Sequence, residues 1–187
     1  MLLLVDNYDS FTYNIHQYLS EFGVEIVVIR NNEFTIEEVG DMAPEKIVLS
    51  PGPCIPQKAG ISTDLVRRFG AEIPTLGICL GHQCIGNAYG GIVGAAGEIM
   101  HGKVSSIYHD GLNLFNGLPD PFDAVRYHSL AISPKDMPKE LEVSAWTDNG
   151  IVMGVRHKTH PVEGIQFHPE SIMTKVGKTI LGNFLEM

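Results

Sequence analysis

The chain has 187 residues, of which 44% are hydrophobic, so it can bury a core without a disulfide or metal staple and is too apolar to be disordered. Thirteen basic against 22 acidic side chains give a net charge of −9, which argues against nucleic acid as the main partner because phosphate binding needs clustered cations. No apolar run reaches the roughly 20 residues of a membrane helix.

The chain start and the cysteines indicate the compartment. The apolar first residues meet Asp6 at once and have no basic flank, so they do not resemble a signal peptide. Three cysteines cannot all pair, and this favours free thiols in a reducing compartment. We expect one cytoplasmic domain over residues 1–187, with the plastid stroma as the alternative location.

The first half of the chain alternates strand and helix patterns. Ser10 is the expected N-cap of the first helix, and Thr35 and Glu38 have the spacing of a capping box. Such alternation favours a parallel sheet with helices on both faces. Strands are expected at 2–5, 24–29, 46–50 and 73–78, and helices at 11–22, from 35 onward and at 64–69.

After Gly90 the pattern changes to short β-like segments separated by turn residues, before a last helix at about 176–185. We therefore predict an α/β fold: a three-layer sandwich around a mostly parallel central sheet with an antiparallel β extension. The β-like segments are 91–93, 103–108, 124–132, 141–146, 151–157 and 162–167.

The strongest chemical motif is Gly77-Ile78-Cys79-Leu80-Gly81, directly after an apolar strand. Glycines two residues on either side of a nucleophile, between a strand and a helix, are typical of a nucleophile elbow. The positive end of the helix dipole there favours a thiolate, and the Leu80 amide would face an oxyanion. The alternative is a buried structural cysteine, which is about equally common for this motif alone.

A base for Cys79 is expected in Phe167-His168-Pro169-Glu170, at the end of a later strand. Residues two apart in extended chain project to the same side, so His168 and Glu170 can face one site. A histidine can accept the thiol proton while a carboxylate fixes its tautomer. Alone, the pair would more often be a surface ion pair, and only the elbow cysteine makes it a candidate catalytic pair.

Ser50-Pro51-Gly52-Pro53 follows a buried strand and forms a rigid loop in which the Gly52 amide is open to approach. This amide is a candidate second oxyanion donor, although a simple strand-ending turn would have the same sequence. The histidines and cysteines do not form a zinc set, and no phosphate-binding loop is present. We expect no metal and no cofactor in this chain.

Together, Gly-Ile-Cys-Leu-Gly-His-Gln at 77–83, Ser-Pro-Gly-Pro at 50–53 and Phe-His-Pro-Glu at 167–170 resemble the class I glutamine amidotransferase family over essentially the whole chain. Residues 6–14, 100–103 and 126–130 narrow the likeness to the small glutaminase subunits of anthranilate synthase and aminodeoxychorismate synthase. Residues 97–100 and 146–148 look slightly more like the tryptophan-pathway subunit than the folate-pathway one.

The resemblance implies that Cys79 attacks the side-chain amide of L-glutamine, that His168 transfers the proton and that Glu170 orients His168. It implies that the Gly52 and Leu80 amides hold the oxyanion. The ammonia would pass to a larger chorismate-binding synthase subunit, near which residues 101–103 are expected to lie. The implied substrate-binding residues are Gly52, Pro53, Cys54, Gln83, Ser129 and Leu130.

One position departs from the family pattern, because Cys54 stands where many members have a second glycine. An oxidative pairing of Cys54 with Cys79 is a minor hypothesis. Four functional readings stay open: glutaminase for anthranilate formation, the same role for aminodeoxychorismate or for both, a free-standing γ-glutamyl hydrolase, and a non-catalytic binding subunit. The intact Cys79, His168 and Glu170 argue against the last.

Overall fold

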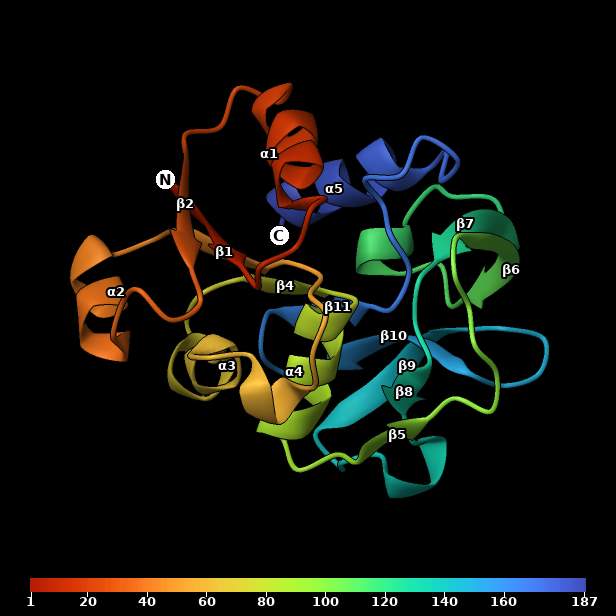
Figure 1. The fold of residues 1–187 in the computed structure, drawn as a ribbon. Helices are drawn as coiled ribbons and strands as arrows, with labels where there is room; N and C mark the ends of the chain where they lie inside the picture. The colour runs from red at the N-terminus through yellow and green to blue at the C-terminus, as the bar shows by residue number, and fades with distance from the viewer.

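The computed structural model describes residues 1–187 and contains one nine-stranded sheet in the order β2-β1-β3-β4-β11-β10-β9-β6-β7 (Figure 1). The strands are β1 (Leu2–Asp6), β2 (Ile26–Arg30), β3 (Lys46–Leu49), β4 (Thr75–Ile78), β6 (Lys103–His109), β7 (Phe122–Arg126), β9 (Leu141–Trp146), β10 (Val152–His157) and β11 (Val162–Ile165). A separate two-stranded antiparallel sheet joins β5 (Val93–Ala95) to β8 (Leu130–Ile132).

The large sheet is parallel in its first part and antiparallel in its second. Strands β2, β1, β3, β4 and β11 pair in parallel, and the antiparallel pairings begin between β11 and β10. The predicted α/β fold with an antiparallel extension is therefore confirmed. The junction matters because β4 and β11 are adjacent, and the chain leaving each of them contributes to the site described below.

Alternation along β1 separates two cores. Leu2 and Leu4 face a cluster that includes side chains of α1 (Thr12–Ser20) and α5 (Gly177–Leu185), whereas Leu3 and Val5 face the opposite cluster. That opposite cluster is built on α2 (Ile36–Met42), α3 (Ser62–Phe69) and α4 (Leu80–Ala88). Period-two alternation places successive side chains on opposite faces of a strand. Both faces of the sheet are covered by helices at β1 (Figure 1), so its first four residues, Leu2 to Val5, are all apolar.

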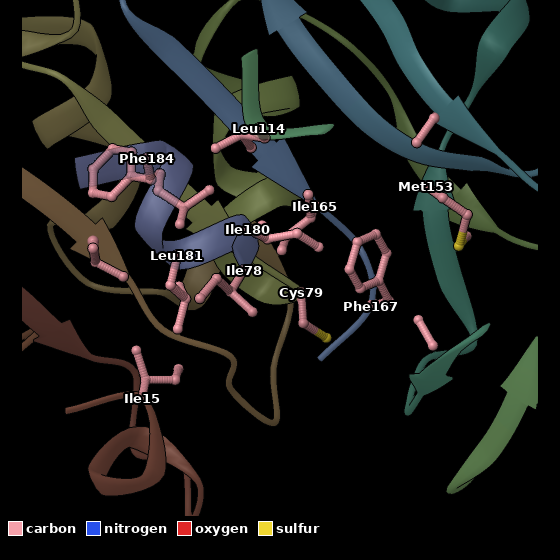
Figure 2. Close-up of a cluster of buried hydrophobic side chains, with 14 of the residues drawn as sticks. Ile15, Ile78, Cys79, Leu114, Met153, Ile165, Phe167, Ile180, Leu181 and Phe184 are labelled. Atoms are coloured by element: carbon pink, nitrogen blue, oxygen red, sulfur yellow. The ribbon is translucent and has the colours of Figure 1, made fainter. Parts of the chain in front are cut away.

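Figure 2 shows Cys79 among the buried side chains of the first cluster, next to Ile78 at the end of β4 and with Phe167 beside it. The cluster packs α5 against the sheet through Ile180 and Leu181. The position of Cys79 is therefore fixed by close packing. A buried and rigid environment is what a preorganised nucleophile requires.

The first helix corrects one expectation. The spacing predicts a helix from residue 11 to 22 with Ser10 as its N-cap, but α1 spans Thr12–Ser20 and no side chain caps it. The Asp9 carboxylate accepts a hydrogen bond from the Phe11 amide at 2.8 Å, while Ser10 is exposed. The expected Ser10 cap is therefore wrong, and Asp9 bonds the residue that precedes the helix. The capping box of Thr35 and Glu38 is confirmed.

The strand expected over 124–132 is also wrong in one respect, because the structure divides it into β7 and β8. Residues 127–129 leave the ladder between them, so that β8 pairs with β5 instead. The interruption places Ser129 beside a cavity, and an uninterrupted strand would not have done so. No helix of this chain is long and apolar enough to span a bilayer.

Candidate active site

Cys79 occupies a strained turn between β4 and α4. Its φ of 53° and ψ of −102° lie in a region that side chains rarely adopt, and such strain is typical of functional positions. The turn is held by a 2.8 Å hydrogen bond from the Cys79 amide to the Ile165 carbonyl. Only 6% of the residue's surface is exposed to solvent, so the nucleophile is almost fully enclosed by the fold.

The two glycines of the elbow are required by packing. A Cβ on Gly77 would overlap the backbone of Gly81, and a Cβ on Gly81 would overlap the backbone of Leu49. The start of α4 therefore crosses both β4 and the end of β3 at backbone distance. This confirms that Gly77 and Gly81 let neighbouring chain pass closely.

His168 and Glu170 form the expected pair. The His168 Nδ1 is 2.5 Å from the Glu170 Oε1, and both side chains are buried. The His168 amide donates to the Val125 carbonyl at 3.0 Å, which ties this segment to β7. The surface ion pair considered as an alternative is excluded by this burial.

The second ring nitrogen of His168, Nε2, is buried and has no hydrogen-bond partner. Burial lowers the pKa of His168, but the adjacent Cys79 side chain and the Glu170 carboxylate raise it by more, so the net pKa lies above the ordinary value. The ring is therefore disposed to hold a proton beside the sulfur.

The loop at Gly52 is anchored by a buried asparagine. The Asn7 amide and side chain donate to the Ser50 hydroxyl and carbonyl, each at 2.8 Å. The Asn7 Oδ1 in turn accepts from Asn31 at 2.9 Å and from Ser62 at 2.7 Å. With all its side-chain polar atoms bonded, Asn7 holds the Ser-Pro-Gly-Pro loop beside the elbow.

A cavity of about 250 Å³ opens beside Cys79. This volume is smaller than that of the pockets of about 300–1,000 Å³ that bind drug-sized ligands. The cavity therefore has a size that suits an amino acid. The structure brings all six predicted substrate-binding residues to it. The cavity is lined by Gly52, Pro53, Cys54, Ile55, Cys79, Leu80, Gln83, Tyr127, His128, Ser129 and Leu130.

Cys54 lies on the wall of the same cavity as Cys79, and both thiols are free. The Cys54 sulfur donates to the Lys58 carbonyl within its own turn at 3.4 Å. The oxidative pairing of the two residues stays a prediction.

Three polar residues at the site were not predicted from the sequence. Gln166 is fully buried and donates from Nε2 to the Cys79 sulfur at 3.5 Å. Arg126 donates from Nε to His128 at 2.9 Å, and His128 Nδ1 lies 2.8 Å from the Leu130 carbonyl. Gln166 and His168 are two apart, so the same period-two argument that found Glu170 would have found Gln166.

A second cavity of about 340 Å³ is lined by Phe11, Tyr127, His168 and Glu170 among others. The Tyr127 ring is 5.1 Å from the His168 ring in an edge-on arrangement and lines both cavities. Asp9 lies close enough to His168 and Glu170 to interact with both charges, and burial raises the pKa of Asp9. Cys79 thus lines the first cavity and His168 lines the second, and Tyr127 contributes to both.

An α/β sheet with a cysteine at a strand-to-helix elbow, and a paired histidine and carboxylate after the adjacent strand, defines a cysteine-dependent acyl-transfer site. The family model described as glutamine amidotransferase class-I matches residues 3–187. The chain belongs to this family, and the resemblance found in the sequence is confirmed.

Proteins of similar sequence show which members of the family this chain resembles. The chain is 53% identical to anthranilate synthase component 2 of Pseudomonas aeruginosa, over 99% of this chain and 94% of that protein. It is 51% identical to the aminodeoxychorismate/anthranilate synthase component 2 of Bacillus subtilis, over 100% of this chain and 96% of that protein. Both parts of the predicted alternative therefore occur among its relatives' names.

A solved structure agrees in fold. A putative GMP synthase subunit from Thermoplasma acidophilum superposes with a TM-score of 0.88 at 27% identity, covering 99% of this chain and 92% of that one. The likeness spans both the parallel and the antiparallel parts of the sheet.

Proposed function

We propose that this chain hydrolyses L-glutamine to glutamate and delivers the ammonia to a larger chorismate-using synthase subunit, for anthranilate formation. The observation that supports this most strongly is the convergence of Cys79, the His168–Glu170 pair and the small cavity at one point of the fold. The names of the relatives, which are components of such synthases, support the choice of acceptor.

In the first half-reaction the Cys79 sulfur forms a bond to the δ-carbon of glutamine. The thiol proton passes to His168, and His168 gives it to the amide nitrogen as the carbon–nitrogen bond breaks and ammonia leaves. The Gly52 and Leu80 amides are assigned to the oxygen on which negative charge develops. Leu80 is the first residue of α4, and the first amides of a helix have no intrahelical acceptor. The product on the enzyme is a γ-glutamyl thioester.

In the second half-reaction a water attacks the thioester carbon while His168 accepts one of its protons. The carbon–sulfur bond breaks, glutamate leaves, and the proton returns to the Cys79 sulfur. Glu170 stabilises the imidazolium at both stages through its bond to Nδ1. Water and glutamine are consumed, and glutamate and ammonia are formed.

The amino and carboxylate ends of glutamine are assigned to Gln83, Ser129 and Leu130, which line the same cavity as Gly52. Residues 101–103, which are expected near the partner, adjoin this region, because the His101 ring lies 5.9 Å from the Tyr127 ring. Tyr127 is partly exposed and lines both cavities. A larger subunit docked on this surface would cover both cavities that Tyr127 lines.

The test is to purify the chain with its bound synthase partner from its native extract, add chorismate and glutamine, and identify the product by mass spectrometry. Anthranilate is the expected product. Aminodeoxychorismate alone would move the chain to folate synthesis, and both products would mark a shared subunit. Full glutaminase activity of the isolated chain with neither product would contradict the proposal in favour of a free-standing hydrolase.

A further inference from the structure

Beyond the triad, the fully buried side chain of Gln166 touches the reactive sulfur. Its Nε2 lies 3.5 Å from the Cys79 sulfur, and its Oε1 accepts a hydrogen bond from Gln83 Nε2 at 3.1 Å. Gln166 therefore joins the nucleophile to a residue of the predicted glutamine pocket. Nothing in the triad mechanism accounts for it.

The direction of these bonds is fixed by a backbone carbonyl. The Leu130 carbonyl can only accept, and Gln83 Nε2 donates to it at 3.2 Å. Because the same NH₂ group faces Gln166, the atom of Gln166 that meets it must be the oxygen. The other end of the Gln166 amide, which faces Cys79, is then the NH₂ group.

A second contact holds the Leu130 carbonyl in place. The His128 Nδ1 donates to this oxygen at 2.8 Å, and the His128 Nε2 accepts from Arg126 Nε at 2.9 Å. Burial and the Arg126 charge lower the pKa of His128 to about 4, so the ring stays neutral and can accept from one nitrogen while it donates from the other. Arg126 cannot accept, and it therefore fixes which His128 nitrogen carries the proton that is donated to the Leu130 carbonyl.

We propose that Gln166 is a further catalytic residue, which donates a hydrogen bond to the Cys79 sulfur and stabilises it as the thiolate. A thiolate accepts such a bond far better than a thiol, because charge-assisted hydrogen bonds are roughly twice as strong as neutral ones. The bond reaches the sulfur from the residue next to the end of β11, the strand that also leads to His168. The imidazolium and the Gln166 amide would then stabilise the same anion.

The proposal rests on the proposed function only for its role in turnover, since the state of the sulfur is measurable without glutamine or a partner. The assay is the rate at which iodoacetamide alkylates Cys79 in the isolated chain, followed from pH 5 to 10 by mass spectrometry. A Cys54→Ser background removes the other accessible thiol. Cys84 is buried and burial raises the pKa of its thiol to about 12, so it stays unreactive. The Cys79→Ala chain measures the background alkylation that does not come from Cys79.

Gln166→Met keeps the length of the side chain but removes both polar atoms. We expect alkylation at pH 7 to fall about fivefold, the value of one ordinary hydrogen bond, with the midpoint of the pH profile moved to higher pH. In Gln166→Glu the side chain still accepts a hydrogen bond from Gln83 but places a carboxylate against the sulfur. We expect the alkylation rate at pH 7 to fall further in this variant than in Gln166→Met. The matched control is Gln57→Met, the same replacement at an exposed position, which should not move the profile.

A purely structural Gln166 would give a different result: the melting temperature would fall while the alkylation profile of both variants stayed that of the parent. That outcome would overturn the proposal even if the chain proved to be an active glutaminase. If Gln166→Met does not fold, Gln166→Glu decides alone, because an unchanged midpoint there is incompatible with a donor at the sulfur. A loss of glutaminase activity with an unchanged profile also contradicts it.

Discussion

Gly52 packs directly against Leu80: a Cβ on Gly52 would lie 2.6 Å from the Leu80 Cδ2 and 2.8 Å from the Asn7 carbonyl oxygen. Only glycine permits this close approach of the loop to the side chain of Leu80, the other residue whose amide is proposed to bind the oxyanion. This packing gives the Ser-Pro-Gly-Pro motif a physical reason. It also leads to the first prediction.

Gly52→Ala should lower kcat for glutamine hydrolysis about 10²-fold or more, the usual cost of displacing one oxyanion donor, while the chain stays folded. The added methyl group has to push the loop away from Leu80. Gly94→Ala is the control, since a Cβ there meets nothing within 4 Å. Steady-state kinetics on the complex with the synthase partner, with melting curves, checks it. Equal kcat for the two variants would contradict the oxyanion assignment.

Glu170→Gln should lower kcat by about 10²-fold, at the lower end of the effect of acid–base groups. Because the carboxylate contributes to the raised pKa of His168, its removal lowers that pKa, and the alkaline limb of the pH–rate profile should move to lower pH. Glu140→Gln, at an exposed site, is the control. A pH profile identical to that of the parent would show that Glu170 does not act through His168.

Asn7→Ala should lower the free energy of unfolding by about 2–3 kcal/mol, because the buried Ser50, Asn31 and Ser62 groups lose their partner. Asn32→Ala is the matched control, since Asn32 is exposed and its side chain accepts a bond from the Tyr8 hydroxyl. Urea unfolding of both chains measures the difference. Equal losses would mean that Asn7 does not anchor the loop.

Glu163 should make stability depend on pH. Burial raises the pKa of this carboxyl to about 7, against the opposing effects of Asn113 and Arg156. The folded chain therefore holds a proton that the unfolded chain has lost, and the free energy of unfolding should fall as pH rises from about 4.5 to 7, by at most roughly 3 kcal/mol.

Glu163→Gln removes this titration while its oxygen can still accept from Asn113, which now bonds Glu163 at 2.7 Å. The variant should be more stable than the parent at pH 8 and similar near pH 5. Urea unfolding at several pH values tests this, with exposed Glu37→Gln as control. A parental slope that persists in Glu163→Gln would assign the pH dependence to another group.

The sequence predicted most of the site because its residues are encoded by local patterns. The flanking glycines identify Cys79 as a candidate nucleophile. The two-residue spacing of His168 and Glu170 identifies them as a candidate pair. The polar network was not predicted, because Gln83 and His128 meet at the Leu130 carbonyl, and Gln83 lies on α4, far along the chain from the other two residues. The Gln83–Gln166 bond joins residues 83 positions apart, a separation that no local pattern encodes.

The prediction that Ser10 caps the first helix was wrong for a related reason. A serine before an apolar helix is a good N-cap by composition, but Asp9 reaches the Phe11 amide first, and Thr12 donates to Asp6 instead. The carboxylates of Asp9 and Asp6 thus bond the Phe11 amide and the Thr12 hydroxyl at the start of the helix, in competition with Ser10. Propensity ranks single residues and does not include such competition.

The central claim is that Cys79 forms a covalent γ-glutamyl intermediate. The most direct measurement is acid quenching of the chain, in complex with its synthase partner, during turnover of isotopically labelled glutamine, followed by peptide mass spectrometry. We expect a labelled γ-glutamyl thioester on the peptide that contains Cys79, and we expect both the thioester and glutamate formation to be lost in Cys79→Ala. Glutamate formation that continues in Cys79→Ala, or a label on any other residue, would contradict it.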